Sequence, residues 1–212
     1  MIKKSASSMP SYTPLEEFLN ALSHGIGAAL SLWGVIMLIT KNLYRKNFLP
    51  GILIYGVTLF MLYSVSSIYH ALTGGKIKSI FRKFDHCSIF LLIAGTYTPI
   101  CMNYITEPSG IIVLLTVWAV AIVGISLNLI DVNKFSKISM ACYLVMGWSI
   151  VFIFKPAMRC LSAFQLKWLL IGGIFYSVGA ILYVLGKKIK YVHFVWHLFV
   201  LAGSICHYQV LV

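Results

Sequence analysis

Acidic residues are scarce in this sequence. Five Asp and Glu side chains stand against 17 Lys and Arg, and charged residues of both signs make up only 10% of the 212 residues. A soluble domain is about a quarter charged, so this chain cannot cover a water-exposed surface with polar groups. Polar segments that interleave basic and aromatic residues are also missing, which argues against nucleic-acid binding. The net charge of +12 is better explained by membrane topology and anionic lipid headgroups.

Cysteine motifs are missing as well. The five cysteines are an odd number, and no two of them form a CxxC pair. All except Cys160 lie within apolar runs, namely Cys87, Cys101, Cys142 and Cys206. This pattern argues against a disulfide framework and a cysteine-rich zinc site, and it favours a role for these cysteines as small packing residues.

Long apolar runs dominate what is present. Hydrophobic residues make up 60% of the chain, with charge-free runs at 20–40, 48–72, 87–106, 110–130, 138–154, 168–186 and 191–212. Each run has the length that a helix needs to cross about 30 Å of hydrocarbon. Alternation with a period of two is absent, which argues against strands. We therefore predict an all-α integral membrane protein, with residues 1–212 forming a single seven-helix transmembrane domain that includes a short cytoplasmic segment, 1–19.

The distribution of basic residues predicts the orientation of the helices. With seven helices, eleven Lys and Arg lie on the side of the N-terminus and six lie on the opposite side. The positive-inside rule then places the N-terminus in the cytoplasm and the C-terminus outside. No signal peptide is expected, because the first apolar run follows Glu16 and Glu17 and is long enough to stay in the membrane.

Most histidines are predicted to gather at one membrane level. Odd-numbered helices begin, and even-numbered helices end, on the side of the N-terminus. The residues at that level are His24, His70, Asp85, His86, His193 and His197. Ionisable residues within membrane spans are costly and usually functional. The grouping depends on the number of helices and not on their orientation.

The sharpest local motif is His193-Phe-Val-Trp-His197. Residues i and i+4 lie on one helix face, so both imidazoles can reach one metal ion. His70 lies at the right depth to be a third ligand, which leaves the open fourth position typical of catalytic zinc. Asp85 is a candidate to hydrogen-bond a water molecule there or to act as a base. The alternative is that the two histidines of the motif contact lipid headgroups.

Ser66 lies one turn before His70 on the same helix face. It is a candidate catalytic residue that could orient His70 or a metal-bound water. Alternatively, its hydroxyl is satisfied by the carbonyl group one turn back, as is common in membrane helices.

A polar stripe enters the first predicted helix. Thr13, Pro14 and Glu16 predict a capping box at the helix start. Glu16, Asn20 and His24 are also spaced at i, i+4 and i+8. We interpret this stripe, together with His86, as support for the polar cluster.

Four segments together resemble the bacterial hemolysin III family. They are residues 16–27 (EEFLNALSHGIG), 66–70 (SSIYH), 83–99 (KFDHCSIFLLIAGTYTP) and 193–197 (HFVWH). The family belongs to the progestin and adipoQ receptor group, and its bacterial branch is also called membrane homeostasis proteins. The resemblance implies a seven-helix fold like that of the adiponectin receptors, with zinc held by His70, His193 and His197. It also implies that Asp85 contacts the zinc-bound water.

Several functions are compatible with these residues. In the related receptors and in similar alkaline ceramidases, such a site is linked to hydrolysis of ceramide-type amides, which suggests an intramembrane zinc-dependent hydrolase of a lipid amide or ester. A non-enzymatic regulator of membrane composition with structural zinc is the alternative. A channel or proton pathway would require polar residues across the whole depth of the membrane, whereas here they lie mostly at one level, which favours a site.

A fourth function, cytolysis, is suggested by the family name alone. The expected location is the bacterial plasma membrane, with membrane lipids as environment and possible substrate.

Overall fold

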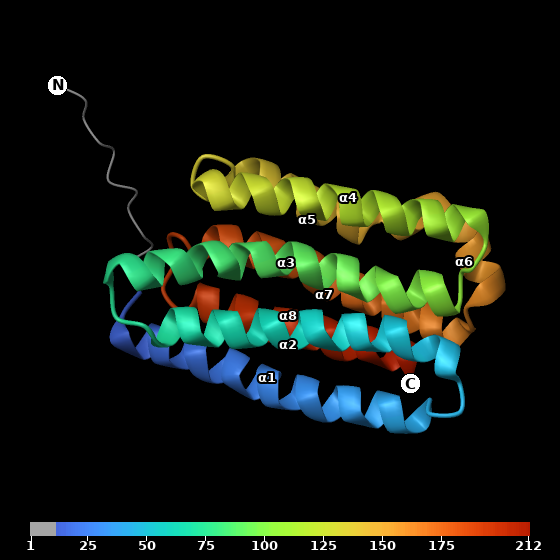
Figure 1. The fold of residues 1–212 in the computed structure, drawn as a ribbon. Helices are drawn as coiled ribbons and strands as arrows, with labels where there is room; N and C mark the ends of the chain where they lie inside the picture. The colour runs from blue at the N-terminus through green and yellow to red at the C-terminus, as the bar shows by residue number, and fades with distance from the viewer. Residues whose placement is uncertain (1–11) are drawn as a thin grey trace.

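The computed structural model describes residues 12–212, which form helices joined by loops and contain no strand. The long helices are α1 (Pro14–Lys41), α2 (Leu49–Ala71), α3 (Gly75–Asn103), α4 (Pro108–Asp131), α7 (Ala163–Leu185) and α8 (Val192–Leu211). Shorter elements are η1 (Lys46–Phe48), α5 (Ser136–Gly147), η2 (Ser149–Ile153) and α6 (Phe154–Cys160). Short loops join them in one elongated bundle (Figure 1), in which each long helix runs antiparallel to the one before it, except that α5, η2 and α6 together form the return crossing between α4 and α7.

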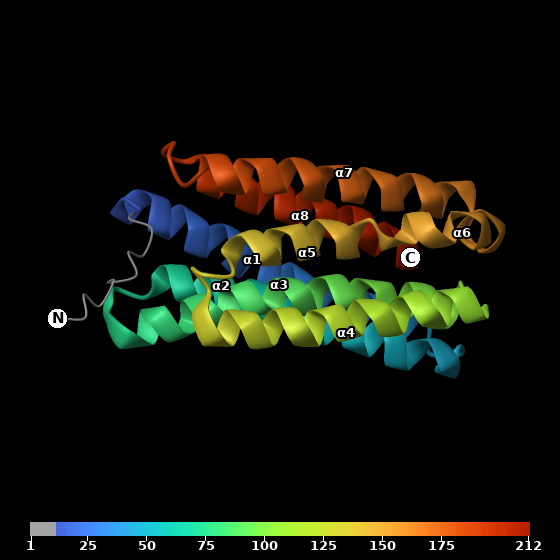
Figure 2. The ribbon, with the colours of Figure 1, turned by 90° about the horizontal axis from the view of Figure 1, so that it is seen from above.

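The helices α1, α2, α3 and α4 pack in sequence order, and α8 closes the bundle between α7 and α1. Seen from above, α7 and α8 lie on one side and α3 and α4 on the other, with α5 above the space between them (Figure 2). α5 makes few contacts with α7. The starts of α1, α3 and α8 and the end of α2 therefore meet at one end of the bundle (Figure 1).

Lipid is the solvent of the outer faces. Large apolar side chains point outward along the long helices, for example Ile112, Leu115, Ile122 and Ile130 of α4, each more than 60% exposed. Among residues 12–212, six helical segments are long and apolar enough to cross a membrane, including Ser136–Cys160 taken as one segment. α3 is not among them, because its first third is charged, although it is 29 residues long and lies within the bundle. The all-α, multi-pass architecture is confirmed, while the count of seven spans and the orientation remain predictions.

The fifth predicted span, 138–154, differs from an uninterrupted helix. α5 ends at Gly147, and a 3₁₀ segment leads into α6. Pro156 lacks an N–H group, so it suits the first turn of α6, whereas in a helix interior it would remove one hydrogen bond and kink or break the helix. Tyr97 compensates for the break, since its hydroxyl donates to the carbonyl oxygen of Gly147 (2.9 Å) and accepts from the backbone N–H of Ile150 (2.9 Å). The irregular backbone is thereby hydrogen-bonded inside the bundle, as a membrane requires.

Candidate metal centre

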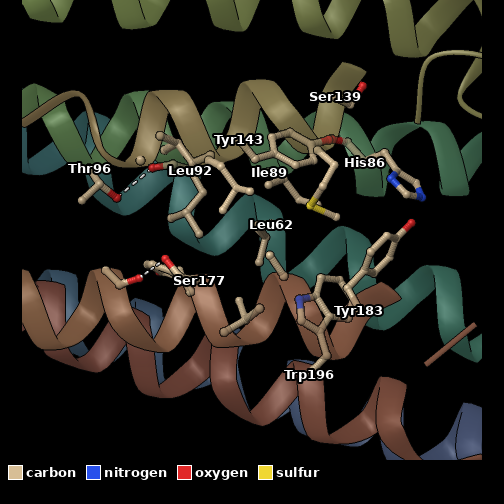
Figure 3. A pocket seen from close by; sticks show the side chains of 18 of the residues that line it. Leu62, His86, Ile89, Leu92, Thr96, Ser139, Tyr143, Ser177, Tyr183 and Trp196 are labelled. Carbon is tan, nitrogen blue, oxygen red and sulfur yellow. Dashed lines mark hydrogen bonds between the residues drawn. The ribbon is translucent and has the colours of Figure 1, made fainter. Parts of the chain in front are cut away.

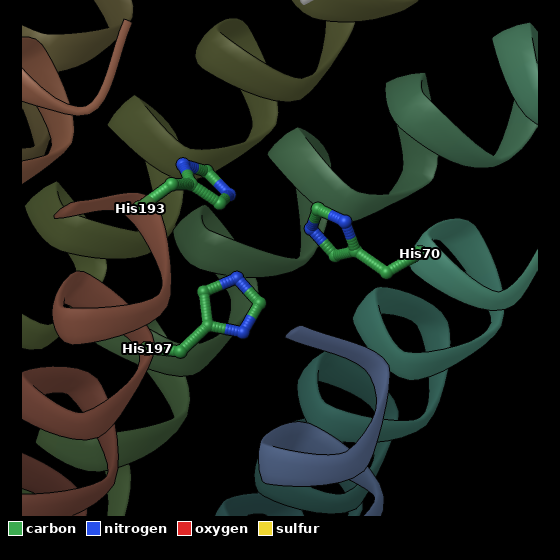
Figure 4. Close-up of side chains that lie close together, drawn as sticks. All are labelled: His70, His193 and His197. Carbon is green, nitrogen blue, oxygen red and sulfur yellow. The ribbon is translucent and has the colours of Figure 1, made fainter. Parts of the chain in front are cut away.

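Three histidines from two distant helices come together at the end of the bundle where α1, α3 and α8 begin. His70 lies in the last turn of α2, and His193 and His197 lie in the first two turns of α8. Their ring centroids are 5.0 to 5.3 Å apart, and the rings face a common point (Figure 4). One nitrogen of each ring lies within 4.8 Å of the others, and all three residues are buried. This geometry can hold a metal ion.

Glu17 fixes the orientation of the His70 ring. The Nδ1–H group of His70 donates to Oε2 of Glu17 at 2.6 Å. Nε2 of His70 then carries the lone pair, and it is buried without a hydrogen-bond partner. The other carboxylate oxygen of Glu17 accepts from Nζ of Lys78 at 2.6 Å, and Lys78 also donates to the carbonyl oxygen of Leu72. A carboxylate behind a ligating histidine is the usual outer-shell partner in metal sites.

The His197 ring is oriented in the same way by the backbone of α1. Nδ1 of His197 lies 3.2 Å from the carbonyl oxygen of Asn20, which can only accept, so Nδ1 is the protonated nitrogen. Ser23 donates its hydroxyl to the same carbonyl oxygen and lies 3.2 Å from the same ring nitrogen. Nε2 of His197 therefore also carries a lone pair, and it has no hydrogen-bond partner in the described chain.

His193 has no hydrogen-bond partner on either ring nitrogen within residues 12–212. The ring of Tyr12 lies against it at 4.6 Å, and the ring of Trp196 lies at 4.7 Å on another side. Burial raises the pKa of Tyr12, which keeps its phenol neutral beside the site. Leaving a buried polar group unpaired costs about 1 to 3 kcal/mol. Three such imidazole nitrogens that converge on one point are explained most simply by a shared metal ion.

The loop before α8 is held by Glu16. Its side chain forms the predicted capping box with Thr13, which is confirmed, and it also accepts from the backbone N–H of Tyr191 at 2.7 Å. Tyr191 has a left-handed backbone with φ of 63° and precedes the first residue of α8. Glu16 thus joins the start of α1 to the start of α8. Its partner Tyr191 lies two residues before His193 in the chain.

The other predicted site residues lie around this centre. The ring of His24 stacks on that of His197 with a centroid distance of 3.7 Å, and neither of its nitrogens has a partner in the described chain. Asp85 is buried in α3 and does not belong to the group of three nitrogens. Ser66 lies beside Asp85, yet its hydroxyl makes no hydrogen bond of ordinary geometry. His86 is farther out, where its carbonyl oxygen accepts from the hydroxyl of Tyr143.

A cavity begins beside the metal centre and extends between α3, α5, α7 and α8. Its empty volume, including its open side, is about 1150 Å³. His24, Asp85, His86 and Trp196 line the end near the centre. Apolar side chains such as Leu62, Ile89 and Leu92 line its length, facing α7 and α8 across the space (Figure 3). The loose packing of α5 against α7 leaves this space open.

The sequence patterns did not point to Glu17, Ser23 and Lys78. A signal for Glu17 was present, because residues 17 and 24 are separated by seven positions, or about 20° less than two full helical turns. Residues 16 and 24 are about 80° apart by the same rule. Glu17 therefore lies closer than Glu16 to the face that carries His24. No comparable signal existed for Lys78, which looked like an ordinary solvent-exposed loop charge.

Comparison with known proteins shows which family this chain belongs to. The family model described as Haemolysin-III related matches residues 12–208. The chain belongs to the haemolysin III family. The chain is 41% identical to "Hemolysin-3" of Bacillus cereus over 191 residues, which cover 89% of the chain and 87% of the relative.

Two further relatives extend the haemolysin III comparison. The chain is 39% identical to a "Hemolysin-3 homolog" of Bacillus subtilis, with 91% of each chain covered. It is 27% identical to the human "Monocyte to macrophage differentiation factor" over 163 residues, which cover 73% of the chain and 66% of the relative. Together with the membrane-spanning helices, membership in the haemolysin III family identifies a multi-pass protein of the plasma membrane.

Proposed function

We propose that this protein is an intramembrane zinc-dependent hydrolase of a lipid amide or ester that acts in membrane lipid homeostasis. The observation that carries the proposal is the position of three converging, unpaired histidine nitrogens beside a largely apolar cavity that also contains a buried carboxylate. A metal site of this kind at the end of an apolar cavity suits an amphiphile better than a water-soluble substrate.

The ligand set favours zinc. Three neutral imidazoles, with two rings fixed through Nδ1 by Glu17 and by the carbonyl oxygen of Asn20, match the three-ligand sites of catalytic zinc. Zinc–nitrogen bonds of 2.0 to 2.1 Å require nitrogens about 3.3 Å apart in a tetrahedral site. The three imidazole nitrogens lie within 4.8 Å of one another, which is about 1.5 Å from this separation at most. None of the five cysteines belongs to the group, which argues against a structural cysteine site.

Residues of the chain would supply the remaining chemistry. When bound, zinc acts as a Lewis acid toward a carbonyl oxygen and lowers the pKa of a water molecule. Asp85 is the base that accepts a proton at its carboxylate, and the buried hydroxyl of Ser66, which has no partner in the described chain, is free to orient a water molecule there. The unpaired nitrogens of His24 can hydrogen-bond the polar part of the substrate. The apolar walls between α3 and α8 hold an acyl chain and exclude bulk water.

The deciding experiment compares Asp85→Asn with His70→Ala in purified protein. Elemental analysis gives the zinc content, and turnover of a ceramide-type amide or a fatty acyl ester gives the activity. We expect about one zinc per wild-type chain, full zinc without turnover in Asp85→Asn, and loss of both in His70→Ala. Asp131→Asn is the matched control, because Asp131 is an exposed carboxylate that accepts only from the backbone N–H groups of Asn133 and Lys134.

Two results would contradict the proposal. Full turnover in Asp85→Asn with zinc bound would remove Asp85 as the base, and a regulator with structural zinc would become the better interpretation. Loss of zinc in Asp85→Asn as complete as in His70→Ala would make Asp85 a ligand and close the fourth position.

A further inference from the structure

Apart from Lys78, the basic residues at the metal-centre end of the bundle form no salt bridge within residues 12–212. Each of the five acidic residues of the sequence is otherwise engaged: Glu16 caps α1, Glu17 binds His70 and Lys78, Glu107 pairs with Arg159 at the far end, Asp131 binds backbone N–H groups, and Asp85 is buried. Within residues 12–212, no salt bridge is formed by Lys76, Arg82, Lys83, Lys134, Lys137, Lys187, Lys188 or Lys190. Their charge must be balanced by anions from outside the chain.

Two of these cations lie about one helical turn from residues that line the cavity. Arg82 is one helical turn before His86, and Lys187 is four residues after Tyr183, and both His86 and Tyr183 line the cavity. Nζ of Lys187 lies 4.7 Å from the centre of the Tyr183 ring, so this side chain folds back toward the cavity. Arg82 donates from Nη2 to Oδ1 of Asn133 at 2.7 Å, which fixes the guanidinium group and leaves its other N–H groups available.

The segments that carry the two cations face each other, because the ring centroids of His86 and Tyr183 lie 6.1 Å apart. Burial lowers the pKa of the Lys187 amine, and the positive charge of Arg82 lowers the pKa further. Two like charges held together in a partly buried place repel each other, and an anion between them would relieve this repulsion. The planar guanidinium group of Arg82 suits a phosphate, which it can bind through two N–H groups.

We propose that Arg82 and Lys187 bind the phosphate of an anionic phospholipid, one acyl chain of which enters the cavity between α3, α5, α7 and α8. A single amphiphile satisfies both features, because the cations lie just beyond the cavity end at the level of lipid headgroups. In such a lipid, the ester carbonyls lie between the phosphate and the acyl chains, which brings an ester toward Asp85 and His24. This last step rests on the proposed function, whereas phosphate binding needs no turnover.

Brominated lipids test this inference, because bromine on an acyl chain quenches nearby tryptophans. Trp148 and Trp196 line the cavity, and the exposed Trp33 reports the surrounding lipid. We expect phosphatidylglycerol with brominated chains to quench wild-type fluorescence more strongly than brominated phosphatidylcholine at equal content. The measurement is made at about 0.5 M salt, where diffuse attraction is largely screened.

Charge variants show which residues cause the preference. In the double variant Arg82→Gln/Lys187→Gln we expect the preference, expressed as a ratio of dissociation constants, to fall about fivefold per cation removed, which corresponds to about 1 kcal/mol each. The double variant Lys76→Gln/Lys188→Gln removes the same charge from the same end of the bundle away from the cavity, and it should keep the preference. Arg82→Lys/Lys187→Arg should also keep it, which separates lost charge from misfolding.

Three outcomes would overturn the inference. They are equal quenching of the wild type by both lipids, an equal loss in the Lys76/Lys188 control, and complete competition by glycerol 3-phosphate. The last would show a site for free phosphate that does not depend on an acyl chain. A wild type that shows the preference but hydrolyses no lipid would contradict the proposed function and leave this inference standing.

Discussion

Nδ1 of His70 donates a 2.6 Å hydrogen bond to the carboxylate of Glu17, which lies 53 residues earlier in the chain and on another helix. This bond determines which nitrogen of His70 is available to a metal ion. The same carboxylate binds Lys78 of α3, so three helices meet at one acidic side chain. The metal centre therefore depends on a residue that would not touch the metal itself.

Glu17→Gln should weaken metal binding without unfolding the protein. Glutamine is nearly isosteric, but its neutral side chain orients His70 less firmly and no longer increases the basicity of the ring. Loss of an outer-shell partner typically costs about 10 to 100-fold in metal affinity, and zinc titration against a competing chelator measures the change. Glu107→Gln breaks the ion pair with Arg159 at the opposite end of the bundle and serves as control. Unchanged affinity in Glu17→Gln would show that the hydrogen bond has no role in binding.

Removal of the metal should lower thermal stability. A ligand that binds only the folded state stabilises it by about 4 kcal/mol at a thousandfold excess over its Kd, and the proposed metal ion would join α2 to α8 in this way. We expect excess chelator to lower the Tm of detergent-purified wild type. His193→Ala should already melt at the lower temperature and should not respond to the chelator. A chelator effect of equal size in His193→Ala would place the stabilising ion elsewhere.

Tyr97→Phe should destabilise the fold by loosening the break after α5. The variant leaves the carbonyl oxygen of Gly147 and the backbone N–H of Ile150 without their partner inside the bundle. An unsatisfied buried group costs about 1 to 3 kcal/mol, which should appear as a lower midpoint of thermal unfolding. Tyr44→Phe is the control, since Tyr44 is 99% exposed. Equal midpoints for the two variants would mean that water or lipid headgroups satisfy these backbone groups.

The C-terminus should face the outside of the cell. The basic excess at the end of the bundle where α1 begins predicts a cytoplasmic metal centre. Reporter fusions at Val212 test this, with one reporter active only in the cytoplasm and the other only outside. Cytoplasmic activity at Val212 would require either an even number of spans or a reversed protein.

The sequence alone predicted the meeting of His70 with His193 and His197, because helix count and span length determine which residues share a membrane level. Periodicity also found the HxxxH pair and the capping box at Thr13. It did not reveal the break after Gly147, since apolarity continues through the break and only Pro156 marks it. The cavity was also not predictable, because it results from how closely α5 and α7 pack. Glu17 was missed because a carboxylate beside a predicted helix start is usually only a cap.

The bond between Glu16 and Tyr191 links the first helix to the last across 175 residues. Chains emerge from the ribosome with the N-terminal part first, so α1 and α2 are in the membrane long before α8 has been synthesised. His70 therefore lacks both partner histidines, His193 and His197, until α8 packs between α1 and α7. The three histidines of the proposed centre can thus bind one metal ion together only after α8 has packed, which would make metal capture a late step in biosynthesis.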